Sequence, residues 1–190
     1  MNARRLPPVG ALVGALVLSA CGASGGVTTT GDAPTKTSAG ASSPSPTAAQ
    51  EQAAKVGSAI TLKGNGEKPA KVKVTVVKVV DNAKGADEFT KPAPGKRFVS
   101  VQFTIQNVGP NAYEDSPSNG SKLIDSENQQ YQASFQTSNA GPAFPSPTKV
   151  APGKAAKGFL TYEVPTAAKI KGVQFGTDSG FGESGEWRLT

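Results

Sequence analysis

The chain has 190 residues, carries a net charge of +6, and contains one cysteine and no histidine. The absence of histidine excludes Ser-His-Asp and Cys-His catalytic arrangements. Together with the single thiol, it also excludes zinc and blue copper sites built from histidine and cysteine. Arginines are few, and most aromatic residues occupy positions expected to face a core, so we expect no nucleic-acid partner.

The first 20 residues have the features of an export signal. Arg4-Arg5 gives a positive start, and the apolar stretch Val9–Leu18 follows it. Because a membrane-spanning helix needs roughly 20 apolar residues, this stretch is too short to be a permanent span. The small residues Ser19-Ala20 stand directly before Cys21, an arrangement that resembles the lipobox of a bacterial lipoprotein. We therefore predict that residues 1–20 are a lipoprotein signal peptide, cut between Ala20 and Cys21.

Cys21 is the predicted site of lipid attachment. After cleavage its sulfur would carry a diacylglycerol, and two or more acyl chains such as palmitate anchor a protein stably to a membrane. The alternative is plain secretion, in which Cys21 is removed or remains as a spare thiol. The lipoprotein prediction accounts for the thiol. It makes the membrane a partner through the lipid, and it places the protein on the extracytoplasmic face of the cell membrane.

Residues 21–55 form the predicted tether. Beyond Cys21 this segment is nearly all Gly, Ala, Ser, Thr and Pro, and it cannot bury enough apolar surface to offset the entropy of ordering, so we expect disorder. A flexible linker of this length spans about 30 to 35 Å. Its Thr28–Thr30 and Ser42-Ser43 clusters are alternatively acceptors for O-glycosylation. The remaining residues, 56–190, suffice for one domain with its own core.

The domain shows the period-two alternation of half-buried antiparallel strands. The clearest pattern runs from Arg97 to Val108, and a second runs from Lys71 to Val80. Other strands are predicted around residues 60–62, 122–124, 131–135, 159–164, 173–175 and 187–189. No segment keeps a 3.6-residue apolar repeat, and Gly and Pro interrupt the chain often. The pattern predicts an all-β fold of about seven or eight strands, either an antiparallel β-sandwich or a closely related barrel, with no disulfide.

One strand breaks its own alternation. Val72, Val74 and Val76 share a face, but Lys78 then occupies the next inward position. A β-bulge at Val76-Val77 would return Val77 and Val79 to the core face and turn Lys78 outward.

Several motifs, in this order and spacing, resemble a known family. They are Gly95–Val101, Thr104–Gly109, Leu123–Asp125 with Tyr131, Val150–Lys154 and Gly158–Pro165. Together they resemble the domain of unknown function numbered 4352, which is found in exported bacterial proteins and lipoproteins, over about residues 63–175. The resemblance implies an immunoglobulin-like sandwich, similar to that of a mycobacterial immunoprotective secreted protein, and an extracytoplasmic setting. It brings no catalytic residues, and it leaves the Gly-rich stretch 177–186 unexplained.

These observations predict a non-enzymatic binding or interaction module held at the cell envelope. The candidate contact regions are the long loops Asp81–Pro94, Val108–Gly120 and Ser138–Lys149, because binding is commonly placed on loops over a rigid scaffold. Phe144 in the last of these either is exposed for contact or packs over the core. The excess of lysines favours an anionic wall polymer as partner, and an envelope protein is the other candidate. We predict no catalytic residue, cofactor or metal.

Three alternatives stay open. An enzyme acting on wall polymers would need two carboxylates about 5 to 10 Å apart, one with a raised pKa. A small-ligand carrier would need an apolar cavity between its sheets, which a core packed solid with residues such as Val99, Phe103 and Tyr162 would exclude. Finally, Asp125, Glu127 and Asn128 could bind calcium, although a turn between two strands favours the same residue types.

Overall fold

The computed structural model describes residues 53–189. The predicted signal peptide, Ala20, Cys21 and nearly all of the tether lie outside the described residues. The strands are β1 (Ala54–Lys55), β2 (Ala59–Lys63), β3 (Lys71–Ala83), β4 (Lys96–Asn107), β5 (Tyr113–Asp115), β6 (Ser121–Asp125), β7 (Gln130–Ser134), β8 (Thr148–Val150), β9 (Ala155–Pro165), β10 (Ile170–Gly176) and β11 (Ser184–Arg188). A short 3₁₀ turn, Asp178–Gly180, precedes β11.

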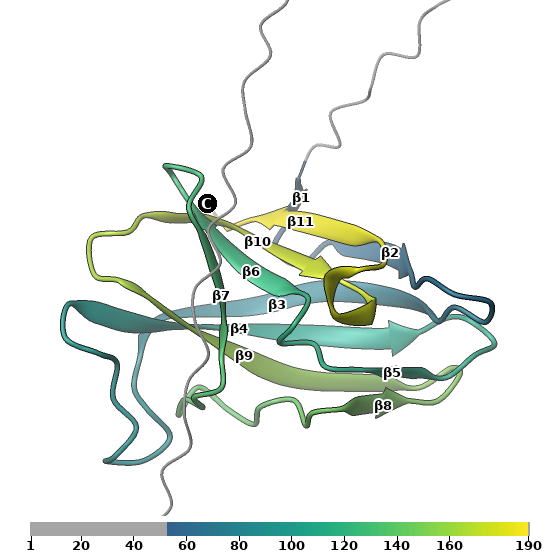
Figure 1. The fold of residues 1–190 in the computed structure, drawn as a ribbon, viewed down its shortest axis with the longest axis horizontal. Coiled ribbons are helices and arrows are strands. Elements are labelled where there is room, and N and C mark those ends of the chain that lie inside the picture. The colour runs from purple at the N-terminus through teal and green to yellow at the C-terminus, as the bar shows by residue number, and fades with distance from the viewer. Residues whose placement is uncertain (1–52, 190) are drawn as a thin grey trace, which may run out of the picture. The chain divides into compact units, whose positions relative to one another are not determined.

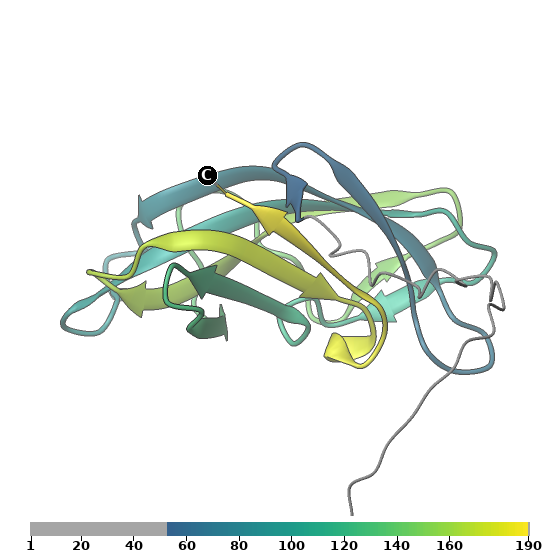
Figure 2. The same ribbon diagram turned by 90° about the horizontal axis from the view of Figure 1, so that it is seen from above.

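Nine of the strands form one hydrogen-bonded sheet in the order β1-β11-β10-β6-β7-β9-β4-β3-β2, and β5 and β8 form a separate pair. The sheet folds over at β7, whose first residues pair with β6 and whose last residues pair with β9. The two halves therefore make the two layers of a sandwich, seen from two directions in Figures 1 and 2. All pairings are antiparallel except that of β1 with β11.

The all-β sandwich expected from the sequence is confirmed. Eight of the strands within residues 53–189 have five or more residues, as predicted, and the additional β1, β5 and β8 have only two or three. β1 begins at Ala54, inside the segment assigned to the tether. Within residues 53–189, no helix is long and apolar enough to cross a membrane.

The core lies between the two layers. Val101, Phe103 and Ile105 of β4 point into it and are fully buried, as their alternation predicts. Across the layers, the Phe103 ring lies 5.4 Å from Phe175 and 6.5 Å, edge to face, from Trp187. Complete burial of one such side chain contributes about 1.5–3 kcal/mol.

The predicted β-bulge in β3 is present, but one of its side chains was placed on the wrong face. Pairing with β4 shifts register between Val76 and Lys78, and Lys78 points outward as expected. Val79 returns to pack against the core. Val77, however, is 39% exposed, because it is the extra residue of the bulge and has no partner in β4.

β9 is buried on both faces, which alternation did not predict. Phe159 and Thr161 point away from the core yet are only 3% and 4% exposed. They are covered by the segment between β7 and β8, where Ala143 pairs with Phe159. Gly141 crosses so close to this strand that a Cβ there would lie 2.6 Å from the Phe159 ring. Phe144, in the same segment, packs against the core.

Candidate functional site

Two of the three predicted contact loops meet in the structure. Gly85 of the β3–β4 loop pairs with Ser138. On either side of this pair, the Asn139 amide donates to the Lys84 carbonyl at 3.0 Å and the Ala86 amide donates to Thr137 at 3.1 Å. The third region, Val108–Gly120, meets the other end of the Ser138–Lys149 loop, because β5 in that region pairs with β8. In Figure 1, the β3–β4 loop extends at the left and the β5–β8 pair lies at the right.

The β3–β4 loop lines an open groove of about 570 Å³ together with the start of β4, and Asn139 is the one residue that the second loop contributes. Ala83 and Phe98, both buried, contribute apolar surface, and Asn82, Arg97 and Asn139 contribute polar groups. The volume is within the range of pockets that bind small ligands or one side chain of a partner. We define these two loops, Asn82–Pro92 and Phe135–Asn139, with the groove that the first of them lines, as the loop-pair site.

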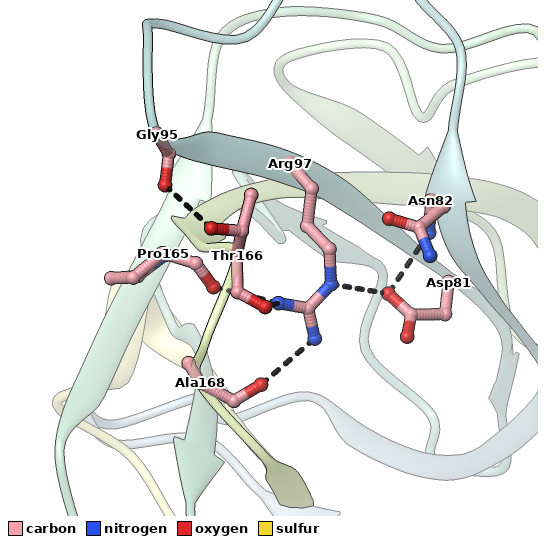
Figure 3. A network of polar contacts seen from close by, with 7 residues as sticks. All are labelled: Asp81, Asn82, Gly95, Arg97, Pro165, Thr166 and Ala168. Atoms are coloured by element: carbon pink, nitrogen blue, oxygen red, sulfur yellow. Dashed lines mark hydrogen bonds and ion pairs between the residues drawn. The ribbon is translucent and has the colours of Figure 1, made fainter.

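Arg97 fixes one wall of this site (Figure 3). Its side chain is 13% exposed, and its Nε donates to Asp81 Oδ1 at 2.7 Å. The two terminal nitrogens donate to three backbone carbonyls at the end of β9 and in the turn that follows it, those of Pro165 at 2.6 Å, Thr166 at 3.0 Å and Ala168 at 2.9 Å. Four of the five guanidinium donors are thus engaged inside the protein. Arg97 therefore holds the β9–β10 turn against β4 and is a structural residue.

Asp87 shapes the tip of the β3–β4 loop. Its Oδ1 accepts the backbone N–H of Phe89 at 3.0 Å and that of Thr90 at 2.7 Å. Hydrogen bonds from the side chain and backbone of Thr90, with a weaker one from Phe89, hold the pKa of Asp87 below its usual value. The carboxylate stays ionised and closes the turn, and this leaves Phe89 87% exposed.

Phe135 is the corresponding exposed aromatic on the second loop. It is 96% exposed and directly precedes the residues that pair with the β3–β4 loop. Single exposed apolar side chains are common on soluble proteins, but aromatic residues are enriched in binding interfaces. Sequence reasoning missed both: Phe135 was placed at the end of a strand, and Phe89 was one residue of a long loop. For Phe89, an aromatic residue among polar and turn-forming residues was the available signal, whereas Phe135 continues the alternation of Tyr131 and Ala133 and carried no such signal.

The turn that was considered as a calcium site binds protein donors instead. Asp125 Oδ1 accepts the backbone N–H groups of Glu127 and Gln129 at 2.9 and 2.8 Å, and its other oxygen accepts the Tyr131 hydroxyl at 2.7 Å. The Tyr131 hydrogen bond is the main cause of a lowered pKa at Asp125. Asn128 Oδ1 accepts from the Lys171 ammonium group at 2.7 Å. Among the described residues, no three His, Cys, Asp or Glu side chains come together as metal ligands.

The surroundings of three carboxylates, those of Asp87, Asp115 and Asp125, are relevant to the enzyme alternative. A glycosidase-type acid needs a raised pKa, whereas those of Asp87 and Asp125 are lowered. Asp115 is buried, which the sequence did not indicate. It accepts the amide and hydroxyl of Ser179 at 3.0 and 2.9 Å and the amide of Ser116 at 2.7 Å. These bonds tie β5 to the turn before β11 and compensate for the burial of the Asp115 carboxylate.

The space between the sheets is filled. The residues that the carrier alternative made decisive are all at most 6% exposed, namely Val99, Val101, Phe103, Leu160 and Tyr162. In the part of the chain that the structure describes, every buried side-chain nitrogen or oxygen has a hydrogen-bond partner. The groove of the loop-pair site lies outside this core.

Comparison with known proteins identifies a family and a fold. The family model described as "Domain of unknown function (DUF4352)" matches residues 64–185. This confirms the resemblance seen in the motifs and extends it through the Gly-rich turn that the motifs did not cover. No curated protein matches the chain.

Among the solved structures that are similar to this chain are two bacterial proteins. The yjhA protein of Bacillus subtilis has a TM-score of 0.52 at 16% identity, over 72% of this chain and 99% of that one. MPT63, a secreted protein from Mycobacterium tuberculosis, has a TM-score of 0.50 at 16% identity, over 68% of this chain and 92% of that one. At such identities the likeness shows a shared fold. With the family model matching well over half of its length, the chain belongs to the DUF4352 family of domains of unknown function.

Proposed function

We propose that this protein is a lipoprotein anchored through Cys21 on the extracytoplasmic face of the membrane, and that its sandwich is a non-enzymatic binding module. The lipobox-like sequence before Cys21 supports the anchor. The description of the structural neighbour MPT63 as a secreted protein is in keeping with export. The observation that carries the binding role is the loop-pair site, where Phe89 and Phe135 stand exposed on two loops joined over a rigid sheet.

The backbone that carries Phe89 is ordered before a partner binds. Asp87 accepts the backbone N–H groups of Phe89 and Thr90 and so holds the loop tip in one shape, which reduces the backbone entropy that binding would cost. The adjacent groove can accept a side chain of a partner. We expect the partner to be an envelope protein that contributes an apolar group.

Lipid attachment is tested by labelling cells with a radioactive fatty acid. We expect label on the wild-type protein and on the neighbouring control Ser24→Ala, and none on Cys21→Ser. Mass analysis of the mature chain should find Cys21 as the first residue, bearing a diacylglycerol. A wild-type chain that carries no label and starts at another residue would refute the anchor.

Binding is tested by photocrosslinking in intact envelopes. A photoreactive phenylalanine analogue replaces Phe89, Phe135 or, as control, the exposed Val108 outside the loop-pair site. We expect discrete protein adducts from positions 89 and 135 and none of the same mass from 108. The same adducts from all three positions, or none from 89 and 135, would contradict the loop-pair site as the binding surface.

A further inference from the structure

Five lysines share the outer face of the layer formed by β2, β3, β4 and β9. We call them the lysine stripe: Lys63, Lys71, Lys73, Lys78 and Lys157. All five are exposed. Three of them, Lys71, Lys73 and Lys78, lie on β3. The bulge at Val77 turns Lys78 onto the same face as the other two.

The strand register shows what surrounds them. Lys63 lies directly opposite Lys71, and Lys73 lies between Thr61 and Gln106. Lys78 is paired with Gln102, and Lys157 with Thr104. The neighbours on this part of the face are therefore threonines and glutamines, and none of the paired positions carries a carboxylate.

The stripe places like charges together without compensation. Direct cross-strand pairs of like charge, such as Lys63 with Lys71, destabilise a sheet. The ion pairs of residues 53–189 join Lys96 to Glu163, Arg97 to Asp81 and Lys149 to Glu114, and they include no stripe lysine. The carboxylates at the border, Glu183 and Asp178, accept the backbone N–H groups of Lys63 and Asn65.

Edge protection explains only part of this arrangement. Lysines on an edge strand prevent pairing with other chains, and β2 is at the end of the sheet. β3, in contrast, is hydrogen-bonded on both sides, to β2 and to β4. Lys71, Lys73 and Lys78 therefore have no edge to protect, and a bound anion would relieve their repulsion.

We propose that the lysine stripe binds a linear polymer with an anionic group on each repeat, such as a phosphodiester-linked or carboxylated wall polymer. Alternate residues of a strand are spaced by about 6.6 Å, so the outward positions from Lys71 to Lys78 extend over about 20 Å. Such a row of charges suits a linear chain, and the threonine hydroxyls and glutamine amides beside it can donate to its oxygens. A membrane-docking face would instead carry interfacial aromatic residues among the lysines.

This inference deepens the proposed function, since it names a second partner that an exported protein would meet. It is independent of the loop-pair site, which lies on other residues. Lipidation of Cys21 and crosslinking at Phe89 test the function, whereas the stripe is tested with purified components. A negative result for the stripe would therefore leave the results on lipidation and on crosslinking unaffected.

The test uses a soluble chain starting at Gly22, which keeps the whole buried core between Leu62 and Trp187. The probes are poly(glycerol phosphate) and, separately, vesicles containing phosphatidylglycerol, and binding of each is measured by calorimetry at several salt concentrations. One variant carries Lys71→Gln, Lys73→Gln and Lys78→Gln. The matched control loses the same charge at three exposed lysines outside both the stripe and the loop-pair site, through Lys96→Gln, Lys149→Gln and Lys169→Gln.

We expect the stripe variant to lose at least about tenfold in affinity at low salt, and its slope of log K against log salt to fall by about 2, as for three lost phosphate contacts on a single strand. The control should stay within about twofold of the wild type. The unfolding midpoint of the control variant should equal that of the stripe variant or lie below it, because the stripe variant loses the repulsion between its neighbouring lysines.

Three results would overturn the proposal: no binding by the wild type, equal losses in both variants, or binding only to vesicles containing phosphatidylglycerol. Equal losses would indicate a response to net charge alone. Binding to vesicles alone would assign the face to the membrane.

Discussion

Replacing Arg97 by lysine tests how the β9–β10 turn is held. The guanidinium makes four hydrogen bonds, three of them to backbone carbonyls. A lysine ammonium can keep the contact with Asp81, but from there it does not reach the three carbonyls. About three hydrogen bonds are therefore lost. A buried hydrogen bond contributes about 0.5–1.5 kcal/mol, and Pro165 and Thr166 are exposed enough for water to replace part of this. We expect Arg97→Lys to lower the free energy of unfolding by about 2 kcal/mol.

The assay is urea unfolding followed by the fluorescence of Trp187, the single tryptophan, which is fully buried. With a typical slope of the free energy of unfolding against urea concentration, this loss lowers the midpoint of unfolding by about 1 M urea. The control is Asp81→Asn, which keeps an oxygen acceptor on a side chain that is 56% exposed, and it should change stability by less than about 0.5 kcal/mol. If Asp81→Asn costs as much as Arg97→Lys, the ion pair and not the carbonyl bonds holds the turn, and the reasoning fails.

Further outcomes follow from single residues. Val76→Thr buries a hydroxyl and should cost about 1–3 kcal/mol in urea unfolding, whereas Val77→Thr, on the exposed bulge, should change stability by less than about 0.5 kcal/mol; similar losses would place Val77 in the core. In Gly85→Ala, the new Cβ would lie 1.7 Å from the Thr90 carbonyl oxygen, so amide exchange in residues 84–90 should accelerate while core exchange stays unchanged. The lowered pKa of Asp125 means that its ionised form stabilises the fold above its unfolded pKa of about 3.9 and that this contribution is lost as the pH falls through the lower folded value. Asp125→Asn should therefore be less stable than wild type at neutral pH, and the difference should shrink below about pH 4 in thermal melts; a constant difference would contradict this.

The sequence was most informative where one face of a strand is buried and the other is open. β4 meets this condition at Val101, Phe103 and Ile105, and its alternation predicted their burial correctly. β9 does not, because the segment through Gly141 covers its outer face. Such cover depends on a long loop with no periodicity of its own, and no local pattern indicates where it will lie.

The candidate surfaces depend on contacts between residues distant in the sequence. The loop-pair site forms because Gly85 meets Ser138, and neither residue carries a signal for the other. The lysines of the stripe are plain in the sequence, but only the register of β2 with β3 places Lys63 opposite Lys71. Alternation alone would point Lys78 inward, and it is the β-bulge predicted at Val76-Val77 that places Lys78 on the same face as Lys73.

The weak pairing of the short strand β1 affects how far the domain can be pulled from an attachment point. β1 is held to β11 through two residue pairs only, Ala54 with Trp187 and Lys55 with Arg188, and the next backbone bond holds Gly57 to Val76. A pulling force on the preceding chain would therefore detach residues 53–56 first and stop at Gly57, with the core still closed. Each released residue adds about 3.3 Å, so the connection to a distant attachment point could lengthen by about 13 Å under load without unfolding the sandwich.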